Sequence, residues 1–424
     1  MKFWFILAIL LTACRAIAAT KYVDNSGSPT CANNPTNGSE AAPFCTVQYG
    51  ISQISGGDTL YVKNGTYDES FTISGPTGTS PARTVISAYP GHTPVLQGTS
   101  TSAGRMKITG TAYIDFVGFE ITRHNQCLYI DDDAGTGSPA DNIRAYNIIA
   151  HNCGQEGVAI RGDVHDILLD HCTVYDTGQL GTGSNGEGVY VGGGTSPDNS
   201  NAVTIQYCTI HDVQDEGVEL KHGSHDVIVQ NNTLYNCMDP GSSFSTTGGC
   251  IEINETDGEY GSNPNHLVRN NIIHGIPIQG GVTKRGIRAG TGSTVYNNVL
   301  YDLPGVDACV LINNNSSDAF TRNIYHNTCA ASVFTVAAGT TNLTNNIGTT
   351  ASGNVAYSSA YFVDAAGGNF HLLSGSVPVN AGSDLTATVP TDLDGVSRSV
   401  NAPPDHGAYE YAVAIPSARG RMRR

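Results

Sequence analysis

Apolar and polar residues alternate in short runs along the chain instead of recurring at helical spacing. The run GVELK, residues 217–221, is typical, because its second and fourth residues are apolar. Successive side chains of a strand point to opposite faces. We therefore expect Val218 and Leu220 to point into a core, and Glu219 and Lys221 to point outward.

The same five-residue pattern recurs along the chain. Its copies begin at Cys127, Gly157, Gly188, Gly217, Cys250, Gly286 and Cys309. A second pattern, of the type NTLYN, begins at Asn147, Cys172, Cys208, Asn232, Asn271, Asn298 and Asn323. A period near 25 residues (25 from Asn147 to Cys172) predicts a solenoid whose turns are coils of sheet. The Asn and Cys residues that open the second pattern are expected to stack in a ladder from coil to coil.

Two long spacings in this repeat predict insertions near residues 177–202 and 238–265. Both leave the coil close to the GVELK strand. Loops on one face of a rigid repeat array commonly build a binding site.

The two ends of the chain differ from the repeats. Residues 1–19 have a Lys, an apolar stretch and small residues, which is the pattern of an export signal. Secretion after cleavage near Ala16-Ile17-Ala18 is one expectation, and lipid attachment at Cys14 in a bacterial envelope is the alternative. Residues 20–411 form the predicted repeat domain, and residues 412–424 form a basic tail. No later stretch is long and apolar enough to span a membrane.

Composition narrows the choice of partner. The 424 residues include 50 Gly, only 14% are charged, and the net charge is −16. This charge disfavours nucleic acid and anionic membranes as partners. An acidic substrate would need a local positive site or a bridging cation. We expect a monomer.

Export would place the cysteines in an oxidising compartment. Three candidate pairs flank loops: Cys31 with Cys45, Cys237 with Cys250, and Cys309 with Cys329. The connectivity stays open at this point. The chain has no Cys-x-x-Cys or His-x-x-x-His spacing, which disfavours a zinc site.

Stacking the five-residue copies shows which residues share a face. The third positions are Tyr129, Ala159, Tyr190, Glu219, Glu252, Arg288 and Leu311. The fifth positions are Asp131, Arg161, Gly192, Lys221, Asn254, Gly290 and Asn313. The residues that precede each copy are Gln126, Glu156, Glu187, Glu216, Gly249, Arg285 and Ala308. Neighbouring strands lie about 4.8 Å apart. One patch should therefore hold Glu187, Asp215, Glu216, Glu219 and Glu252, with Lys221, Arg285 and Arg288 beside it.

Crowded carboxylates must be protonated, paired with cations or bound to a metal. Calcium takes about 6–8 oxygen ligands, so Glu187, Asp215, Glu216 and Glu219 are candidate ligands for Ca²⁺. The alternative is a solvated salt-bridge surface with no ligand. The charges gather beside both insertions in a chain that is otherwise poor in charge, and this favours a site.

Both ends resemble those of secreted right-handed parallel β-helix proteins. CTVQYGISQI is similar to their short N-terminal capping helix, GGDTLYVKNGTY to their first coil, and DLDGVSRSVNAPPDHGAYEY to their closing segment. The resemblance implies an all-β fold, a single-stranded right-handed parallel β-helix with a short capping helix. An uncovered terminal coil would expose apolar side chains and strand edges, which is why a cap is needed.

The site resembles that of polysaccharide lyases. DEGVEL, from Asp215, is similar to the calcium-binding Asp-Asp-Gly-Trp-Asp-Leu stretch of family 9 pectate lyases, and GEGVYV, with Glu187, is similar to their Ala-Asp-Gly-Phe strand. Glu replaces Asp at several ligands, Val218 replaces Trp, and the family's Gly-Phe-Lys strand corresponds to Gly-Ile-Arg with Arg288. The stretch from Glu219 to Cys237 is also similar to family 6 lyases, the alginate lyase and chondroitinase B type, which implies Lys221 as base. The partner arginine of family 6 is replaced by Asn254.

The resemblance implies β-elimination on a uronate-containing, pectate- or alginate-like polysaccharide. Lys221 is the expected base, with Arg288 as charge stabiliser or alternative base. Substrate contacts are expected from Arg161, Tyr190, Glu252 and Arg285, and Tyr129 is a further candidate for stacking on a sugar ring. Two other classes stay open. Glu219 and Glu252 could act as the carboxylate pair of a glycoside hydrolase, or of an epimerase on the same fold. The chain could also be a non-catalytic carbohydrate-binding or adhesion β-helix.

Overall fold

The computed structural model describes most of the chain. The described residues are 18–132, 140–180, 185–193, 198–221, 223–238, 248–254, 264–277, 284–304, 306–312, 320–330, 334–336, 341–349, 351–398 and 403–411. Cys14, residues 1–17 of the predicted export signal and the basic tail lie outside these ranges. So do His222 and the middle of each predicted insertion. Within the described ranges, no helix has the length and apolarity needed to cross a bilayer.

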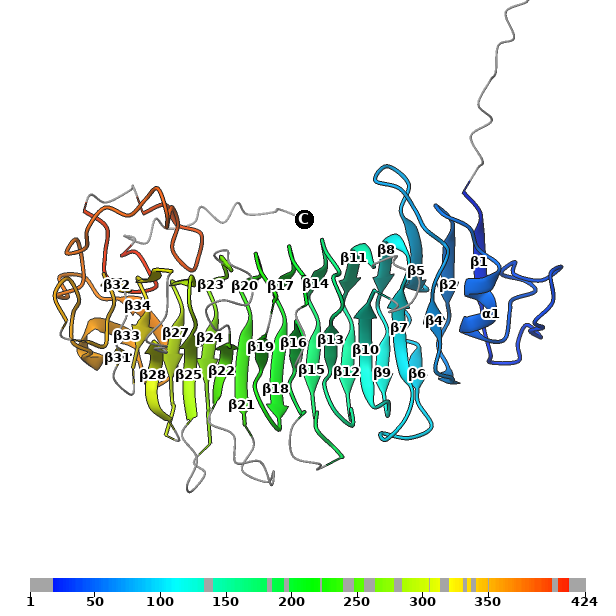
Figure 1. Ribbon diagram of the computed structural model, residues 1–424, viewed down its shortest axis with the longest axis horizontal. Coiled ribbons are helices and arrows are strands. Elements are labelled where there is room, and N and C mark those ends of the chain that lie inside the picture. The colour runs from blue at the N-terminus through cyan, green and yellow to red at the C-terminus, as the bar shows by residue number, and fades with distance from the viewer. Residues whose placement is uncertain are drawn as a thin grey trace, which may run out of the picture.

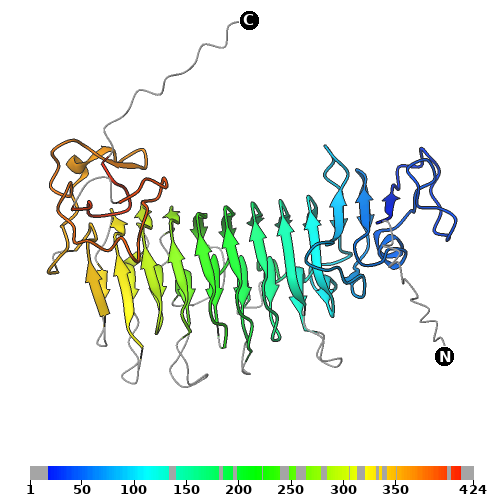
Figure 2. The ribbon, with the colours of Figure 1, turned by 90° about the horizontal axis from the view of Figure 1, so that it is seen from above.

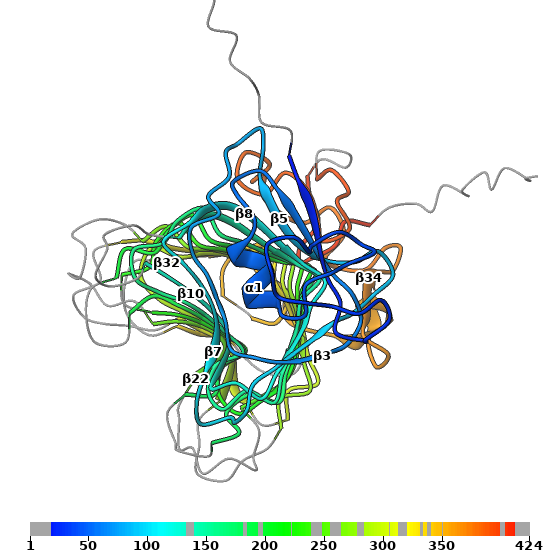
Figure 3. The same cartoon turned by 90° about the vertical axis from the view of Figure 1, so that its right-hand side faces the viewer.

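The chain winds into a long coil with three strands per turn (Figure 1). Each turn passes from a first sheet to a second and then to a third, and the next turn lies beside it (Figure 2). Every strand in these three sheets pairs in parallel with its equivalents in the neighbouring turns. Viewed end-on, the sheets surround one interior, as Figure 3 shows.

Within each sheet, the strands lie side by side in the order in which the chain reaches them. The first sheet contains β1 (Thr20–Val23), β2 (Thr59–Val62), β5 (Thr84–Ala88), β8 (Ala112–Val117), β11 (Asp141–Tyr146), β14 (Leu168–Asp170), β17 (Thr204–Gln206), β20 (Ile228–Gln230), β23 (Leu267–Arg269), β26 (Thr294–Tyr296), β29 (Arg322–Tyr325) and β32 (Thr341–Thr344). The second sheet contains β3 (Thr66–Asp68), β6 (Val95–Gln97), β9 (Glu120–Thr122), β12 (Ile149–His151), β15 (Thr173–Tyr175), β18 (Thr209–Val213), β21 (Thr233–Cys237), β24 (Ile272–His274), β27 (Val299–Tyr301) and β30 (Thr328–Cys329). The third sheet contains β4 (Thr72–Ile73), β7 (Arg105–Thr109), β10 (Gln126–Asp131), β13 (Val158–Ile160), β16 (Val189–Val191), β19 (Val218–Leu220), β22 (Gly248–Ile253), β25 (Lys284–Ala289), β28 (Val306–Ile312) and β31 (Phe334–Val336).

The third sheet has the register that the five-residue pattern predicts. Its third positions pair in one continuous row: Tyr129, Ala159, Tyr190, Glu219, Glu252, Arg288 and Leu311. Val218 and Leu220 are fully buried inside the coil. The parallel solenoid predicted from the repeat is therefore confirmed.

The sequence patterns identified two strands per turn, whereas the structure has three. The strands missed belong to the first sheet, for example β20 and β23. Each is three residues long with one buried central residue, Val229 or Val268. Such short strands carry no glycine and no recurring polar residue that would mark them as copies.

A column of buried side chains, which we call the asparagine ladder, runs between the first and second sheets. Its members are Cys172, Cys208, Asn232, Asn271, Asn298, Asn327, Asn346 and Asn354. Each amide oxygen accepts from the amide group one turn earlier, and each NH₂ donates to a backbone carbonyl. The ladder is confirmed, but two of its predicted members are wrong. Ile148 and not Asn147 lies beside Cys172, and Asn327 takes the place assigned to Asn323.

The left-handed backbone at this corner explains the error at Asn147. The residue before each ladder position has a positive φ, as in Asn231 (57°), Asn270 (56°) and Asn297 (56°). Asparagine tolerates this conformation better than most residues do. An Asn–Asn pair therefore supplies first the turn and then the ladder. Asn147 (φ 53°) supplies only the turn.

Both ends of the coil are covered. The predicted capping helix is α1 (Val47–Ser52), which lies across the open end of the coil in Figure 3 and buries Val47, Gly50 and Ile51. At the other end, the closing segment contains the 3₁₀ helix η1 (Ser359–Tyr361) and the antiparallel pair β33 (Phe362–Asp364) and β34 (Asn369–Leu372). Its fully buried Arg398 pairs with the carboxylate of Glu410.

Four disulfides connect described residues. The three predicted pairs, Cys31–Cys45, Cys237–Cys250 and Cys309–Cys329, are confirmed. A fourth, Cys127–Cys153, was not predicted. Disulfides in this number are typical of proteins that work outside the reducing cytosol.

An outward row of rings runs along the second sheet. His151, Tyr175, His211, Tyr235, His274 and Tyr301 alternate with centroids 4.6–5.1 Å apart. His211 and His274 are held in this stack and take no part in the acid-rich patch of the third sheet.

Candidate active site

The acid-rich patch lies on the outer face of the third sheet, over β16, β19 and β22. The acidic side chains of this patch point away from the interior of the coil, but they are not exposed to solvent. Glu187, Glu216, Glu219 and Glu252 are each at most 5% exposed. The sequence predicted their direction but not their burial, since alternation says nothing about what covers a face.

Three of the acids form a tight group, which we call the glutamate cluster: Glu187, Glu216 and Glu219. Each offers a carboxylate oxygen, and these oxygens lie within 4.8 Å of one another. Asp215, the fourth predicted metal ligand, is also buried, and its side chain interacts with that of Glu216. The structure therefore brings the four predicted ligands together, three of them within reach of one ion.

Burial and mutual repulsion act on this group. Burial raises the pKa of Glu187 well above its ordinary value, and the charges of Glu219, Glu156 and Asp215 raise it further. Burial likewise raises the pKa of Glu216, with added repulsion from Asp215. A carboxylate that costs this much to ionise needs a cation beside it.

Lys221 supplies part of the missing positive charge. Its Nζ lies 3.1 Å from Glu219 Oε1, and Asn254 donates to the same oxygen at 3.4 Å. Burial alone lowers the pKa of the Lys221 ammonium, but the charges of Glu219, Glu187 and Glu216 outweigh it, so the pKa is raised. The ammonium is therefore protonated while the cluster carries its charge.

Arg288, one of the predicted arginines, is held by an acid on the same sheet. Arg288 pairs with Glu252, whose other oxygen accepts from the Gly249 N–H at 2.9 Å. Burial raises the pKa of Glu252, while Arg288 partly opposes this. In this arrangement Glu252 positions Arg288 at the edge of the site. Arg285 lies three residues earlier on β25 and is partly exposed.

Arg161 approaches the site from β13. Its guanidinium pairs with Glu156 and lies over the ring of Tyr190, 4.1 Å from the centroid. The ammonium of Lys221 lies 5.5 Å from the same ring. Two cations therefore lie close to the Tyr190 ring, whose face attracts positive charge. Glu156 is a residue that the sequence analysis placed in a row but did not assign to the site.

Two glycines make room for the cluster. A Cβ on Gly217 would lie 2.8 Å from Leu234 Cδ2 and 2.9 Å from the Cys250 carbonyl, so the turn into β19 requires glycine. A Cβ on Gly248 would lie 2.0 Å from Glu216 Oε1. Gly248 therefore provides the space that the Glu216 carboxylate occupies, a role with no signal in the sequence beyond the glycine itself.

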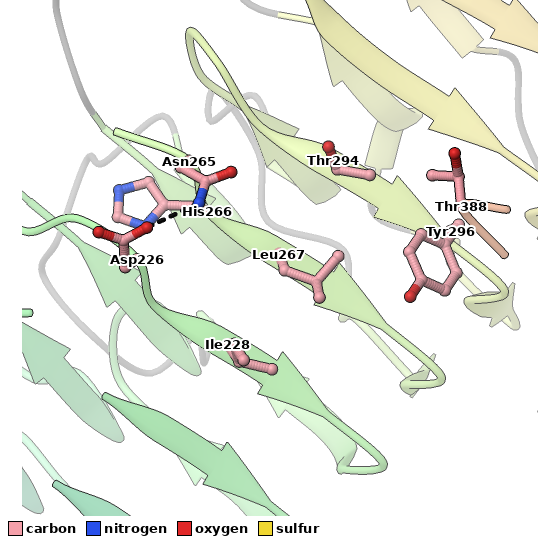
Figure 4. Close-up of a pocket in the computed structure, with 8 residues that line it drawn as sticks. All are labelled: Asp226, Ile228, Asn265, His266, Leu267, Thr294, Tyr296 and Thr388. Atoms are coloured by element: carbon pink, nitrogen blue, oxygen red, sulfur yellow. Dashed lines mark hydrogen bonds between the residues drawn. The ribbon is translucent and has the colours of Figure 1, made fainter. Parts of the chain in front are cut away.

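A separate pocket of about 310 Å³ lies on the first sheet, on a different face from the glutamate cluster (Figure 4). Its walls come from β20, β23 and β26, and Thr388 of the closing segment forms one side. Asn265 donates to Asp226 across it at 2.6 Å. None of the predicted site residues is among the described residues that line this pocket.

The three parallel sheets, wound turn upon turn, define a parallel β-helix protein. The family model "Pel9A-like, right handed beta helix region" matches residues 27–272, which is more than half of the chain. The chain belongs to this family, and the predicted right-handed parallel β-helix is confirmed.

Solved structures show the same fold. Pectate lyase Pel9A is 18% identical, with a TM-score of 0.68, over 93% of this chain and 98% of that one. An alginate lyase from Paenibacillus sp. str. FPU-7 is 21% identical, with a TM-score of 0.57, over 70% of this chain and 98% of that one. A rhamnogalacturonan lyase is 16% identical, with a TM-score of 0.60, over 82% and 91%. No curated protein matches the chain.

Proposed function

We propose that the protein is a calcium-assisted polysaccharide lyase, which cleaves a uronate-containing, pectate- or alginate-like polysaccharide by β-elimination. The observation that carries the proposal is the glutamate cluster, three buried carboxylates within 4.8 Å of one another, next to Lys221. Membership of the Pel9A-like family supports it, as do structural neighbours named as lyases of pectate, alginate and rhamnogalacturonan.

The donor set of the cluster suits calcium. All three groups offer carboxylate oxygens, the ligands that this ion prefers, and the raised pKa values of Glu187 and Glu216 call for a cation. Glu187, Glu216 and Glu219 would hold Ca²⁺, with Asp215 beside them. Calcium, when bound, would supply the positive charge that neutralises the acids and attracts the carboxylate of a uronate.

The side chains around the cluster have distinct proposed roles. With the carboxylate charges of the cluster offset by a bound cation, Lys221 would lose its own proton more readily and, as the neutral amine, would accept the proton from C5 of the uronate, next to the substrate carboxylate. The electron pair forms the C4–C5 double bond as the C4–O bond breaks, and the departing oxygen takes up a proton. Arg288 stabilises the negative charge that develops, or acts as base in place of Lys221. The substrate is contacted by Arg161, Tyr190 and Arg285. Glu252 acts on the substrate through Arg288, with which it forms an ion pair.

The hydrolase alternative receives less support from the side chains. Glu219 and Glu252 are paired across β19 and β22, but each already forms an ion pair, with Lys221 and Arg288 respectively.

We also propose that the protein acts outside the cell as a monomer after loss of residues 1–19, or that it is anchored through Cys14. The four disulfides are consistent with either location.

The test is a panel of uronate polysaccharides, with calcium and then with a chelator, followed by ultraviolet absorbance. If the protein is the proposed calcium-assisted lyase, it produces unsaturated, ultraviolet-absorbing chain ends with calcium and does not produce them with the chelator. A hydrolase would produce reducing ends without absorbance, and an adhesion protein would produce neither. Either of these two outcomes would overturn the proposal.

The role of Lys221 is tested by Lys221→Ala against a matched control, Lys63→Ala. Lys63 also lies beside two acids, Asp24 and Glu40, but far from the cluster on the turn after β2. We expect a loss of at least about 100-fold in kcat for Lys221→Ala and none for the control. An undiminished rate in Lys221→Ala would assign the base to another residue.

A further inference from the structure

The third sheet carries a second arrangement of arginine and tyrosine, three turns before β19. Tyr129 on β10 lies in the same outward row as Tyr190 on β16, with Ala159 of β13 between them. Two strand spacings of about 4.8 Å separate the rings by about 10 Å along the coil. The small Ala159 leaves no long side chain standing between them.

Each of these rings carries an arginine. Arg161 lies over Tyr190, and Arg105 of β7 lies over Tyr129 with its Cζ 4.3 Å from the ring centroid. The two arginines differ in their other partners. Arg161 is partly buried and pairs with Glu156, whereas Arg105 is exposed and forms no ion pair with any residue in the described ranges.

The surroundings of Arg105 are unusual for this acidic chain. Because the protein has a net charge of −16, its surface offers many carboxylates with which an arginine could form an ion pair. Instead, the guanidinium of Arg105 lies over the aromatic ring of Tyr129, and Arg105 is exposed to solvent. Two residues further along β7, Lys107 Nζ contacts Asp131 at 3.0 Å. A planar, held guanidinium is suited to bind a carboxylate through two parallel hydrogen bonds.

We propose that Arg105 and Tyr129 form a distal subsite that binds the carboxylate of a uronate unit in the same polysaccharide that reacts at the glutamate cluster. This inference rests on the proposed function and deepens it. The substrate would then lie along the axis of the coil, from β19 towards β7, over about 19 Å or four strand spacings. One sugar of a 1,4-linked chain advances by roughly one such spacing, so the subsite serves chains of five or more units.

The position of Arg105 gives the subsite a specific kinetic signature. A contact so far from the reacting bond acts on binding and not on the bond-breaking step. Loss of one charge-assisted carboxylate contact costs about 10-fold in affinity. The exposed location also predicts that its contribution falls as salt is added.

The experiment compares Arg105→Gln with Arg123→Gln, an exposed arginine in the turn between β9 and β10. Initial rates are measured by absorbance on uronate oligomers of three to eight units. We expect Arg105→Gln to raise KM about 10-fold for oligomers of five or more units, to leave kcat unchanged and to leave trimers unaffected. Arg123→Gln should change nothing. Equal losses on short and long oligomers, or no loss on any, would overturn the subsite.

Binding is measured separately by electrophoresis of the wild type and Arg105→Gln through gels containing the uronate polymer. This separates the two proposals. If the wild type forms no unsaturated ends but is retarded by the polymer, and Arg105→Gln is retarded less, the lyase proposal fails and the subsite stands. If the wild type reacts and the variant matches it in both assays, the subsite fails alone. If the wild type neither reacts nor binds, both fail.

Discussion

The asparagine ladder and the glutamate cluster are both columns of buried polar side chains that stack from turn to turn. In the ladder, Asn232 Nδ2 donates to Asn271 Oδ1 at 3.0 Å, and Asn271 donates to Asn298 at 3.0 Å. In the cluster, the carboxylates of neighbouring turns also come within 4.8 Å, but none has a proton to donate when ionised. The same spacing therefore satisfies one column and leaves the other in conflict.

The difference lies in the chemistry of the side chains. An amide is both donor and acceptor, so identical amides can satisfy one another along a column. Carboxylates are acceptors only, so the repeat that stabilises the ladder forces like charges together. A column of this second kind costs stability unless a cation is bound, and this is why it indicates a site whereas the ladder indicates structure.

The largest expected effect comes from removing one charge of the cluster. Glu216→Gln should lower calcium-dependent activity by about 10²–10³-fold, since the donor set loses a carboxylate. The same change should stabilise the calcium-free protein, because it relieves repulsion on a fully buried group. Rates by absorbance and Tm in chelator measure the two effects. If Glu216→Gln has a lower Tm than the wild type when both are measured in chelator, Glu216 is not under repulsion.

The second prediction concerns a substitution that interrupts the asparagine ladder. Asn271→Ala removes the oxygen that accepts from the Asn232 N–H and leaves buried groups unpaired. We expect a loss of about 3 kcal/mol in the free energy of unfolding, with or without calcium. The exposed Asn342, which donates to Asn323 at 2.9 Å, provides the control Asn342→Ala. Urea unfolding measures both. A loss that calcium restores would contradict a purely structural role.

The contrast also shows how far the sequence predicts the site. Alternation and the period of the repeat predicted the row from Tyr190 through Glu219 to Arg288, because strand register depends only on spacing. They did not predict that Lys221 pairs with Glu219. Such pairs depend on how side chains lean along the sheet, for which the pattern has no signal.

The missed disulfide has a similar cause. Cys127 opens a five-residue copy in the third sheet, whereas Cys153 follows β12 in the second sheet. Their proximity depends on the corner between these two sheets. The two recognised patterns mark the strands on either side of this corner, but alternation and spacing carry no information on how the chain turns between them.

A third prediction concerns pH and separates the two columns without a mutation. The pKa values of Glu187 and Glu216 are raised in the folded protein. A carboxyl with a raised pKa binds its proton more tightly when folded, so its stabilising contribution is complete below the unfolded pKa of about 4.3. Stability should therefore fall as pH rises above that value in chelator. Calcium should reduce this fall. Tm measured from pH 4 to 8 in both conditions tests it, and stability that rises with pH in chelator would contradict it.

The smallest expected effect comes from extending the ladder by one amide. At Cys208 the column changes from Asn to Cys, and the Cys172 N–H meets the Cys208 sulfur at 3.4 Å. Cys208→Asn would offer that N–H an amide oxygen, and its NH₂ would reach the Leu169 carbonyl, as Asn232 reaches that of Ile205. A neutral hydrogen bond of this kind contributes about 1 kcal/mol, so we expect a small rise in Tm and unchanged activity. The same substitution at Cys172 is the control, because the next turn there offers the sulfur of Cys208, whereas the next turn at Cys208 offers the amide oxygen of Asn232. If Cys208→Asn lowered Tm as much as the control, the ladder would depend on the fit of each position and not on amide pairing.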